Sequence, residues 1–256
     1  MLEELRQRLQ ALERPPGLED DPGTVPLGIE GIDQVLGGGL TRGALHEIAA
    51  AGEAHIPSAA GFAAGVAALS CAPSRFLKAG RDHKGAVWIA EDMALAESGS
   101  LHGPGLIDVG LAPERLVMVA AGHRRDLLWA MEEALRCRSI GVVIGELRGG
   151  ALDTVAVRRL SLAAAESGAL AVLLRATPAS DASTAATRWI IGAAPSAPNA
   201  YGLGTPCFAA QLVRNRRGPA GTWIIEWSES DARFIPATHA QPVAQPVPHR
   251  PYRKIA

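Results

Sequence analysis

Residues 41–70 read TRGALHEIAAAGEAHIPSAAGFAAGVAALS, and this stretch decides the fold class of the 256-residue chain. Residues 44–50 are apolar enough for a buried strand, and the Ala- and Gly-rich segment from about Ala59 predicts an apolar helix. A short loop of small residues joins the two. Strand, glycine-containing loop and helix is the arrangement in which a P-loop holds phosphate groups. The stretch therefore predicts a nucleotide-binding type of architecture.

The loop itself lacks the side chains that phosphate binding needs. A working P-loop reads G-x-x-x-x-G-K-[ST], in which the Lys contacts the β- and γ-phosphates and the hydroxyl holds Mg²⁺. Here residues 1–77 contain no Lys, and Pro57 has no backbone N–H to donate. What remains is a vestigial nucleotide site, with Gly52, Glu53 and Ser58 in the loop.

The composition limits the classes of protein to consider. The hydrophobic fraction is 48% and the mean hydropathy is +0.11, which suits a soluble α/β domain with a large core. A net charge of −1 gives the whole surface no preference for nucleic acid or membrane, so any DNA contact has to be local. The apolar run 59–72 is shorter than the roughly 20 residues that span a bilayer. The three cysteines show no metal-ligand spacing and predict reduced thiols in a cytoplasmic protein without a metal site: they are Cys71, Cys137 and Cys207.

Both ends of the chain differ in composition from its centre. Residues 1–14 are predicted to form an amphipathic helix with the apolar stripe Leu2, Leu5, Leu9 and Leu12, and residues 15–24 an acidic linker with Pro and Gly. That stripe either packs on its own domain or docks on a second protein. Residues 237–256 repeat Pro with small polar residues, which predicts a disordered tail. The end of the tail suits either short-motif binding or solubilisation, through Arg250, Tyr252, Arg253 and Lys254.

Two further apolar strands are predicted to end in acids. The predicted strand over residues 86–90 is followed by Glu91, and the predicted strand over residues 141–146 has Glu146 as its last residue. Acids at the carboxyl ends of strands lie where α/β sheets place functional groups. Residues 99–110 predict a Gly-rich loop, and helices are predicted over 124–136 and 154–166. This alternation favours a mostly parallel, twisted sheet with helices on both faces.

The segment LGIEGIDQVLGGGLTRGALHEI, residues 27–48, carries a specific resemblance. Its short helix, glycine cluster and strand ending in Glu-Ile resemble the core of RecA-type recombinases just ahead of their P-loop. Together with the later segments, the chain resembles the RecA-like ImuA family over residues 25–235. The resemblance implies a single RecA-like α/β domain of the P-loop NTPase type over residues 25–236, closed by an antiparallel hairpin.

The resemblance also assigns roles to the two acids. In RecA-like enzymes the Glu that matches Glu91 activates the attacking water, and a Walker-B Asp after a later aliphatic strand helps to hold Mg²⁺. Here Gly145 follows the aliphatic run directly, and Glu146 comes one residue later. Because a shift of one residue turns a side chain to the other face of a sheet, Glu146 would need a local bulge to replace the Asp. With neither the Lys nor the Asp, we expect a protein that is not an enzyme and binds no cofactor.

A basic turn lies between two predicted strands, residues 207–214 and 222–227. Its sequence Arg-Asn-Arg-Arg resembles the K-N-K/R element of recombinases, whose cations reach the nucleotide of a neighbouring protomer. The match lies on Arg214 and Arg216, and Arg217 adds a third cation. The three are predicted to contact phosphate or a neighbouring protein. The alternative is an exposed charged turn without a ligand.

The resemblance implies an accessory role in DNA-damage-induced, error-prone translesion synthesis within the SOS response. The implied partners are a polymerase-like ImuB homologue, an error-prone replicative-type polymerase and RecA, with indirect DNA contact and association with the nucleoid after damage. Two alternatives stay open. One is a divergent DNA-dependent ATPase that uses Glu91, Glu146 and Arg216. The other is a cell-division inhibitor similar to SulA, a shorter RecA-like family that also lacks a P-loop.

Overall fold

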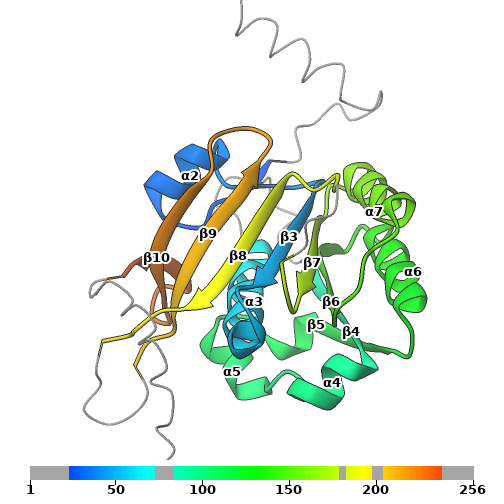
Figure 1. The fold of residues 1–256 in the computed structure, drawn as a ribbon, viewed down its shortest axis with the longest axis horizontal. Helices are drawn as coiled ribbons and strands as arrows, with labels where there is room; N and C mark the ends of the chain where they lie inside the picture. Colours follow the sequence, from blue (N-terminus) through cyan, green and yellow to red (C-terminus); the bar gives the residue numbers. More distant parts are fainter. Residues whose placement is uncertain (1–22, 73–83, 179–182, 198–203, 238–256) are drawn as a thin grey trace, which may run out of the picture.

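The computed structural model describes residues 23–72, 84–178, 183–197 and 204–237. Within these residues, nine strands form one sheet in the order β11-β10-β9-β8-β3-β7-β6-β4-β5 (Figure 1). The strands from β8 to β5 in this order are parallel: β3 (Leu45–Ala50), β4 (Gly85–Glu91), β5 (Leu116–Ala121), β6 (Ile140–Leu147), β7 (Leu170–Arg175) and β8 (Thr187–Ala193). An antiparallel meander completes the sheet: β9 (Cys207–Asn215), β10 (Gly221–Ser228) and β11 (Arg233–Pro236). The predicted fold class is confirmed.

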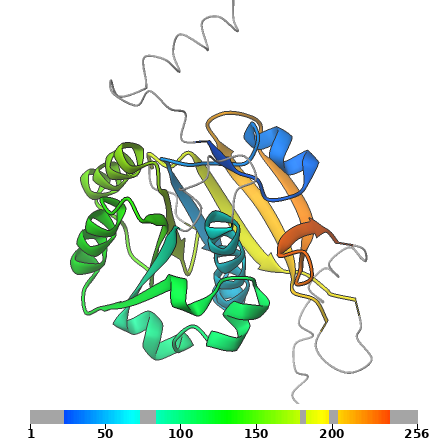
Figure 2. The same ribbon diagram turned by 180° about the vertical axis from the view of Figure 1, so that it is seen from behind.

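Helices cover both faces of the sheet. On one face lie α6 (Arg124–Leu135) and α7 (Thr154–Ser167), whose apolar sides share a core with β4, β6 and β7. The other face, turned to the viewer in Figure 2, carries α2 (Glu30–Leu36), α3 (Ile56–Cys71), α4 (Asp92–Ser98) and α5 (Gly103–Asp108). A small antiparallel pair, β1 (Thr24–Val25) and β2 (Leu40–Thr41), and the 3₁₀ turns η1 (Glu53–His55) and η2 (Pro113–Arg115) complete the elements.

Two predicted boundaries were wrong. Residues 99–110 are not all loop, because α5 forms within them. Pro lies in its first turn, where a missing N–H costs no helical hydrogen bond, and the His102 side chain accepts a hydrogen bond from the Gly105 N–H at 3.3 Å. Helix α3 begins at Ile56, earlier than predicted, because Pro57 likewise fits the first helical turn.

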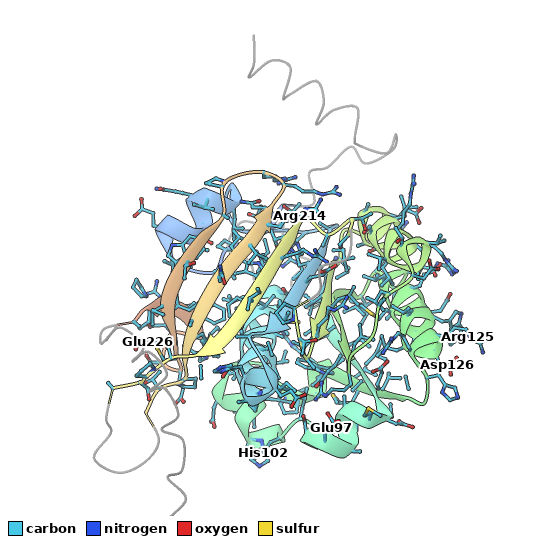
Figure 3. The ribbon with its side chains drawn as sticks, viewed as in Figure 1. Glu97, His102, Arg125, Asp126, Arg214 and Glu226 are labelled. Carbon is cyan, nitrogen blue, oxygen red and sulfur yellow. The ribbon has the colours of Figure 1, made fainter. Side chains whose placement is uncertain are left out.

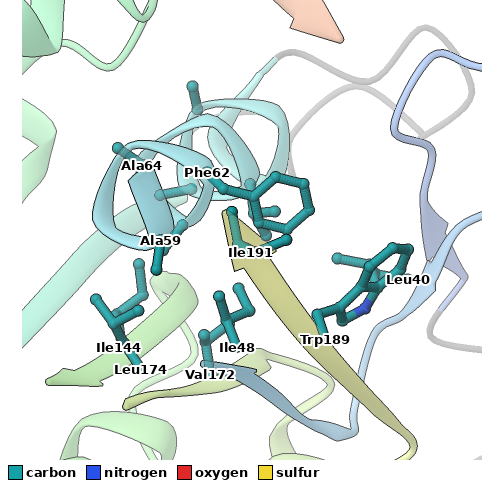
Figure 4. Packing of buried hydrophobic residues seen from close by; sticks show 14 of the residues in the cluster. Leu40, Ile48, Ala59, Phe62, Ala64, Ile144, Val172, Leu174, Trp189 and Ile191 are labelled. Atoms are coloured by element: carbon teal, nitrogen blue, oxygen red, sulfur yellow. The ribbon is translucent and has the colours of Figure 1, made fainter. Parts of the chain in front are cut away.

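Helix α3 lies at the centre of the larger core. Figure 4 shows Phe62 and its neighbours on α3 above the side chains of Ile48 and Ile191. The Phe62 ring lies 4.9 Å from the ring of Phe234. At Gly65 a Cβ atom would lie 2.7 Å from Phe234 Cζ, so only glycine lets the aromatic rings approach this turn.

The stretch Glu53–Cys71 is long and apolar enough to cross a membrane. However, 56% of its most apolar part is buried inside the domain, as in the core helix of a globular domain.

Strand β3 also contains a fully buried histidine. The Nε2 atom of His46 lies 2.9 Å from the Thr41 carbonyl oxygen and must donate to it. Nδ1 then accepts from the Thr187 hydroxyl at 2.8 Å, and the same hydroxyl oxygen accepts from the Trp189 indole at 3.0 Å. Burial lowers the pKa of His46 from 6.5 to about 4, with a smaller contribution from the positive charge of Arg217. The native chain therefore holds this imidazole neutral.

We expect His46 to make the stability of the fold depend on pH. Because its folded-state pKa lies below that of the unfolded chain, its stabilising contribution is complete above pH 6.5 and is lost as the pH falls toward 4. The size of the pKa shift corresponds to about 3 kcal/mol. Urea unfolding at several pH values measures it, with His46→Gln as the control because Gln does not titrate. If the free energy of unfolding declines equally with pH in both proteins, the acid sensitivity comes from other groups.

Candidate functional site

The loop between β3 and α3 is the segment that the sequence predicts as a vestigial nucleotide site. It is tied to the neighbouring strand β8, since the Ala51 N–H donates to the Ile191 carbonyl at 2.9 Å and the Ala193 N–H donates to His55 Nδ1 at 3.0 Å. Gly52 accepts a hydrogen bond from the His55 N–H at 2.9 Å. Glu53 is exposed at the start of η1, and Ser58 is half-buried in the first turn of α3. The loop is thus ordered by its own contacts, and an imidazole occupies part of it.

Glu91 lies at the carboxyl end of β4 and is 8% exposed. One carboxylate oxygen accepts from the Arg124 side chain at 3.1 Å, and the other accepts from the backbone N–H of Arg148 at 2.7 Å. Arg124 is the first residue of α6 and comes from the next strand–helix connection. Both oxygens of Glu91 therefore have partners from this chain.

Arg124 also forms hydrogen bonds with the loop that follows β6. Its guanidinium donates to the carbonyl oxygens of Arg148 at 3.1 Å and Gly149 at 2.7 Å. Gly150 adopts a φ of +74°, and a Cβ at this position would collide with the Arg124 guanidinium. A glycine is required here both for the backbone conformation and for the space. Arg124 thus holds Glu91 and the loop together.

Glu146 is the second predicted acid, and it too is paired. One oxygen accepts from the Trp88 indole N–H at 2.9 Å, and the other lies 2.9 Å from the Arg148 guanidinium. The Arg148 side chain is only 5% exposed and also contacts Glu97 at 2.9 Å and Ser98 at 2.7 Å, both on α4. Arg148 therefore contacts both predicted acids, Glu91 through its backbone and Glu146 through its side chain. Glu97 marks this edge of the sheet in Figure 3.

The side-chain faces in β6 differ from the sequence-based expectation. Strands β4 and β6 pair regularly from Ala86 to Ala90, and the register shift lies before them, at Gly85. Glu146 thus lies on the α3 face without a bulge, together with Ile144. Gly145 lies on the α6 face, where a Cβ would collide with Met131. The local bulge that Glu146 was expected to need is not present, because β6 pairs regularly with β4 through Glu146.

The basic turn lies at the opposite edge of the sheet from Glu91 and Glu146. Arg214 is half-buried and donates to the Ser183 carbonyl at 2.8 Å. Asn215 donates to the Val35 carbonyl at 2.9 Å and accepts from the Arg217 N–H at 3.0 Å, which fixes the turn against α2. The side chains of Arg216 and Arg217 are exposed. Within one chain the structure does not bring the three arginines near the vestigial nucleotide site.

Sequence reasoning missed Arg124, Arg148 and Glu97. A signal was present in the sequence, since an Arg directly after an apolar strand and before Gly149-Gly150 predicts a cation at the carboxyl end of the sheet. The proposed partner-binding residues fall outside the described residues, and this applies to Leu2, Leu5, Leu9, Leu12, Arg250, Tyr252, Arg253 and Lys254.

Comparison with known proteins shows which family the chain belongs to. No model of a known protein family matches it. It is 31% identical over 208 residues to Protein ImuA of Caulobacter vibrioides strain NA1000 / CB15N. The matched region covers 76% of this chain and 79% of that protein. Protein ImuA of strain ATCC 19089 / CIP 103742 / CB 15 gives the same values. The fold is similar to the crystal structure of the RadB recombinase, with a TM-score of 0.53 and 14% identity, over 80% of this chain and 97% of that chain. The RecA-like fold and the sequence identity over most of both proteins establish that the chain belongs to the ImuA family.

Proposed function

We propose that this RecA-like protein is a non-catalytic accessory factor in DNA-damage-induced translesion synthesis, which acts by protein–protein contact. The observation that carries the proposal is the pairing of Glu91 and Glu146 with arginines of the same chain. A phosphoryl-transfer site needs carboxylates that are free to orient water and metal ions. Here each carboxylate is largely buried and compensated by Arg124 or Arg148.

The geometry of the loop supports the same proposal. Phosphate binding at a helix N-terminus depends on backbone N–H groups and a nearby cation. Pro57 removes one N–H from the first turn of α3, and the loop before it contains no Lys. The acidic Glu53 lies exposed at the start of η1 and repels phosphate. These features disfavour nucleotide binding and leave the surfaces of the domain for protein contacts.

The position of Glu146 favours one alternative, a divergent ATPase. Its side chain lies on the face of the sheet that carries α3. In a P-loop protein, the N-terminus of the corresponding helix binds the phosphates on this face. For that function the Arg148 guanidinium would have to leave a buried ion pair when nucleotide binds, at a cost of several kcal/mol. Nucleotide binding therefore separates the two proposals.

We expect no saturable binding of a fluorescent ATP analogue with Mg²⁺ up to about 1 mM. A Kd above this concentration corresponds to a binding free energy smaller in magnitude than about 4 kcal/mol. Fluorescence titration of the full chain measures this, and phosphate release measures hydrolysis. The control is a RecA-type recombinase with an intact P-loop under the same conditions. Saturable binding followed by hydrolysis that Arg216→Gln abolishes would establish the ATPase instead.

The accessory role has its own test with the proposed partners. We expect the purified protein to alter the rate or extent of RecA filament assembly on single-stranded DNA, and to co-purify with an ImuB-type polymerase homologue. Assembly of the division protein FtsZ serves as the comparison, because inhibition of FtsZ with no effect on RecA would support the SulA-like alternative. In this proposal the protein works in the cytoplasm and joins the nucleoid through its partners.

A further inference from the structure

We infer that the amino edge of the sheet, where the parallel strands begin, binds the phosphate backbone of nucleic acid directly. The surface consists of six cations, called here the basic edge: Arg42, Lys84, Arg115, Arg138, Arg216 and Arg217. This site is distinct from the vestigial nucleotide loop, and it does not rest on the accessory role proposed above. Its ligand class is a phosphodiester chain recognised without regard to base sequence.

The topology collects these cations from distant parts of the sequence. Lys84 directly precedes β4, Arg115 directly precedes β5, and Arg138 lies two residues before β6. Because all three strands are parallel, their first residues lie at the same edge. The antiparallel strand β9 ends at this edge, and its turn into β10 contributes Arg216 and Arg217. In Figure 3 the neighbouring Arg214 marks this edge, opposite Glu97.

Helix α3 anchors part of the basic edge through its carboxyl end. The Arg42 guanidinium donates to the Ser70 carbonyl at 2.9 Å, and the Arg115 guanidinium donates to the Cys71 carbonyl at 3.2 Å. Cations at this position also compensate the negative end of the helix dipole. The side chain of Lys84 packs beside Gly141, which adjoins the Ser70 carbonyl. Three cations are thus fixed around one helix end.

The remaining three cations are available to a ligand. Arg138, Arg216 and Arg217 are exposed. No ion pair joins their side chains to a carboxylate in the part of the chain that the structure describes. Arg217 lies close enough to the buried His46 for its charge to act on that residue, which connects the turn to the start of β3. Arginine suits this role because its planar guanidinium forms two hydrogen bonds with a phosphate.

Charge is segregated between the two edges of the sheet. Among the described residues, the acids near the strand starts at the amino edge are Glu47, Glu114, Glu132, Glu133 and Glu166. Glu47 pairs with Arg188, and Glu132 and Glu133 pair with Arg136. The carboxyl edge has five arginines, Arg124, Arg125, Arg148, Arg175 and Arg233, but more acids, namely Glu53, Glu91, Asp92, Glu97, Asp126, Glu146, Asp153, Glu229 and Asp231. The net charge of −1 therefore conceals a local positive surface. A polyanion is attracted to the amino edge and repelled from the vestigial nucleotide edge.

The dimensions fit an extended polyanion. The basic edge runs from β10 to β5, which is eight strands, and a strand spacing of about 4.8 Å gives a length of roughly 34 Å. A repeating phosphate chain matches cations spread over this length. Among the described residues, the exposed aromatic side chain is Trp129, which lies on α6 and not among these cations. Binding is therefore expected to be electrostatic rather than by stacking on bases.

The test measures binding of a fluorescein-labelled 30-nucleotide single strand to the full chain by anisotropy. In 50 mM salt we expect saturable binding with Kd on the order of 10 μM, which weakens steeply by 200 mM salt. We expect Arg216→Gln/Arg217→Gln to weaken it at least 5-fold and to reduce the slope of log K against log salt by about 1.4, since each lost phosphate contact on a single strand contributes about 0.7.

The matched control is Arg125→Gln/Arg158→Gln, which changes the net charge equally. Arg125 is 92% exposed, and both residues lie on α6 and α7 away from the basic edge. We expect this variant to bind within 2-fold of the wild type. Absence of binding at 50 mM salt, or equal weakening by both double variants, would overturn the proposal. The proposal would also be overturned if the chain bound no DNA but bound an acidic protein, with an affinity that falls when Arg216 and Arg217 are replaced.

Discussion

Replacing Arg148 with Met is expected to lower the free energy of unfolding by about 3–5 kcal/mol, because it removes one partner of a buried ion pair. Glu146 would keep its hydrogen bond from Trp88 but would carry an uncompensated charge at 9% side-chain exposure. For a domain of this size the midpoint of thermal unfolding should fall by roughly 10 °C. Thermal and urea unfolding followed by circular dichroism measure both quantities.

The matched control is Arg159→Met, which removes the same type of side chain from an ion pair whose arginine is exposed. Arg159 is 59% exposed, and its partner Glu132 retains a second arginine, Arg136, at 2.7 Å. Because Arg159 is exposed and Glu132 keeps Arg136, we expect this change to cost about 1 kcal/mol or less. Adding Glu146→Gln to Arg148→Met should recover most of the lost stability, since the buried charge disappears while the Trp88 bond remains. If Arg148→Met costs no more than Arg159→Met, the pairing of Glu146 does not hold this edge together.

The contacts of Arg148 show which parts of the candidate site could be predicted from the sequence. Both acids were found because each follows an apolar strand, a local pattern that sequence reasoning can detect. For Glu146 a local signal existed, since its partner Arg148 lies two positions later. The other contacts of this cluster were not found, because they join distant residues. Arg148 contacts Glu97 across 51 positions, and Glu91 binds Arg124 across 33. Only the order of the strands in the sheet brings those segments together.

The basic edge gives a second example of this limit. The turn at Arg214, Arg216 and Arg217 is dense in sequence and was therefore predicted as a phosphate-contact or interface element. Arg42 and Arg115 are isolated cations with no local signal. They join the turn because parallel strands begin at one edge, a consequence of topology rather than of sequence spacing. The fold class was predictable from alternating patterns, whereas the surface it assembles was not.

The face of each side chain in β6 follows from the regular alternation along the strand. The end of the aliphatic run at Ile144 made Gly145 the expected Walker-B position, but the strand continues to Leu147 and keeps its regular pairing with β4. Gly145 is small because α6 packs against it, with Met131 and Leu127 directly over its Cα. Glycine here thus serves helix–sheet packing, which is a structural reason independent of catalysis.

This packing leads to a strong expected effect for Gly145→Asp, the substitution that would restore a Walker-B acid at the position chosen from sequence. A Cβ at this site would collide with Met131 Sδ and lie 3.0 Å from its Cε. Overpacking costs about 1–3 kcal/mol, and an unpaired buried carboxylate adds several more. We expect a loss of about 4 kcal/mol or more in the free energy of unfolding, with no gain in nucleotide binding.

The control for Gly145→Asp is Gly31→Asp, since a Cβ at Gly31 would meet no atom within 4 Å and the site lies in the first turn of α2. An acid in a first helical turn is neutral or slightly stabilising, so this variant should unfold within about 0.5 kcal/mol of the wild type. Gly145→Ala separates the steric effect from the charge, and we expect it to cost about 1–3 kcal/mol. Wild-type stability in Gly145→Asp, together with Mg²⁺-dependent nucleotide binding, would mean that residue 145 faces a phosphate site. The pairing of Gly145 with Ile89 and its contact with α6 predict the opposite, because they direct this position away from α3 and the P-loop remnant.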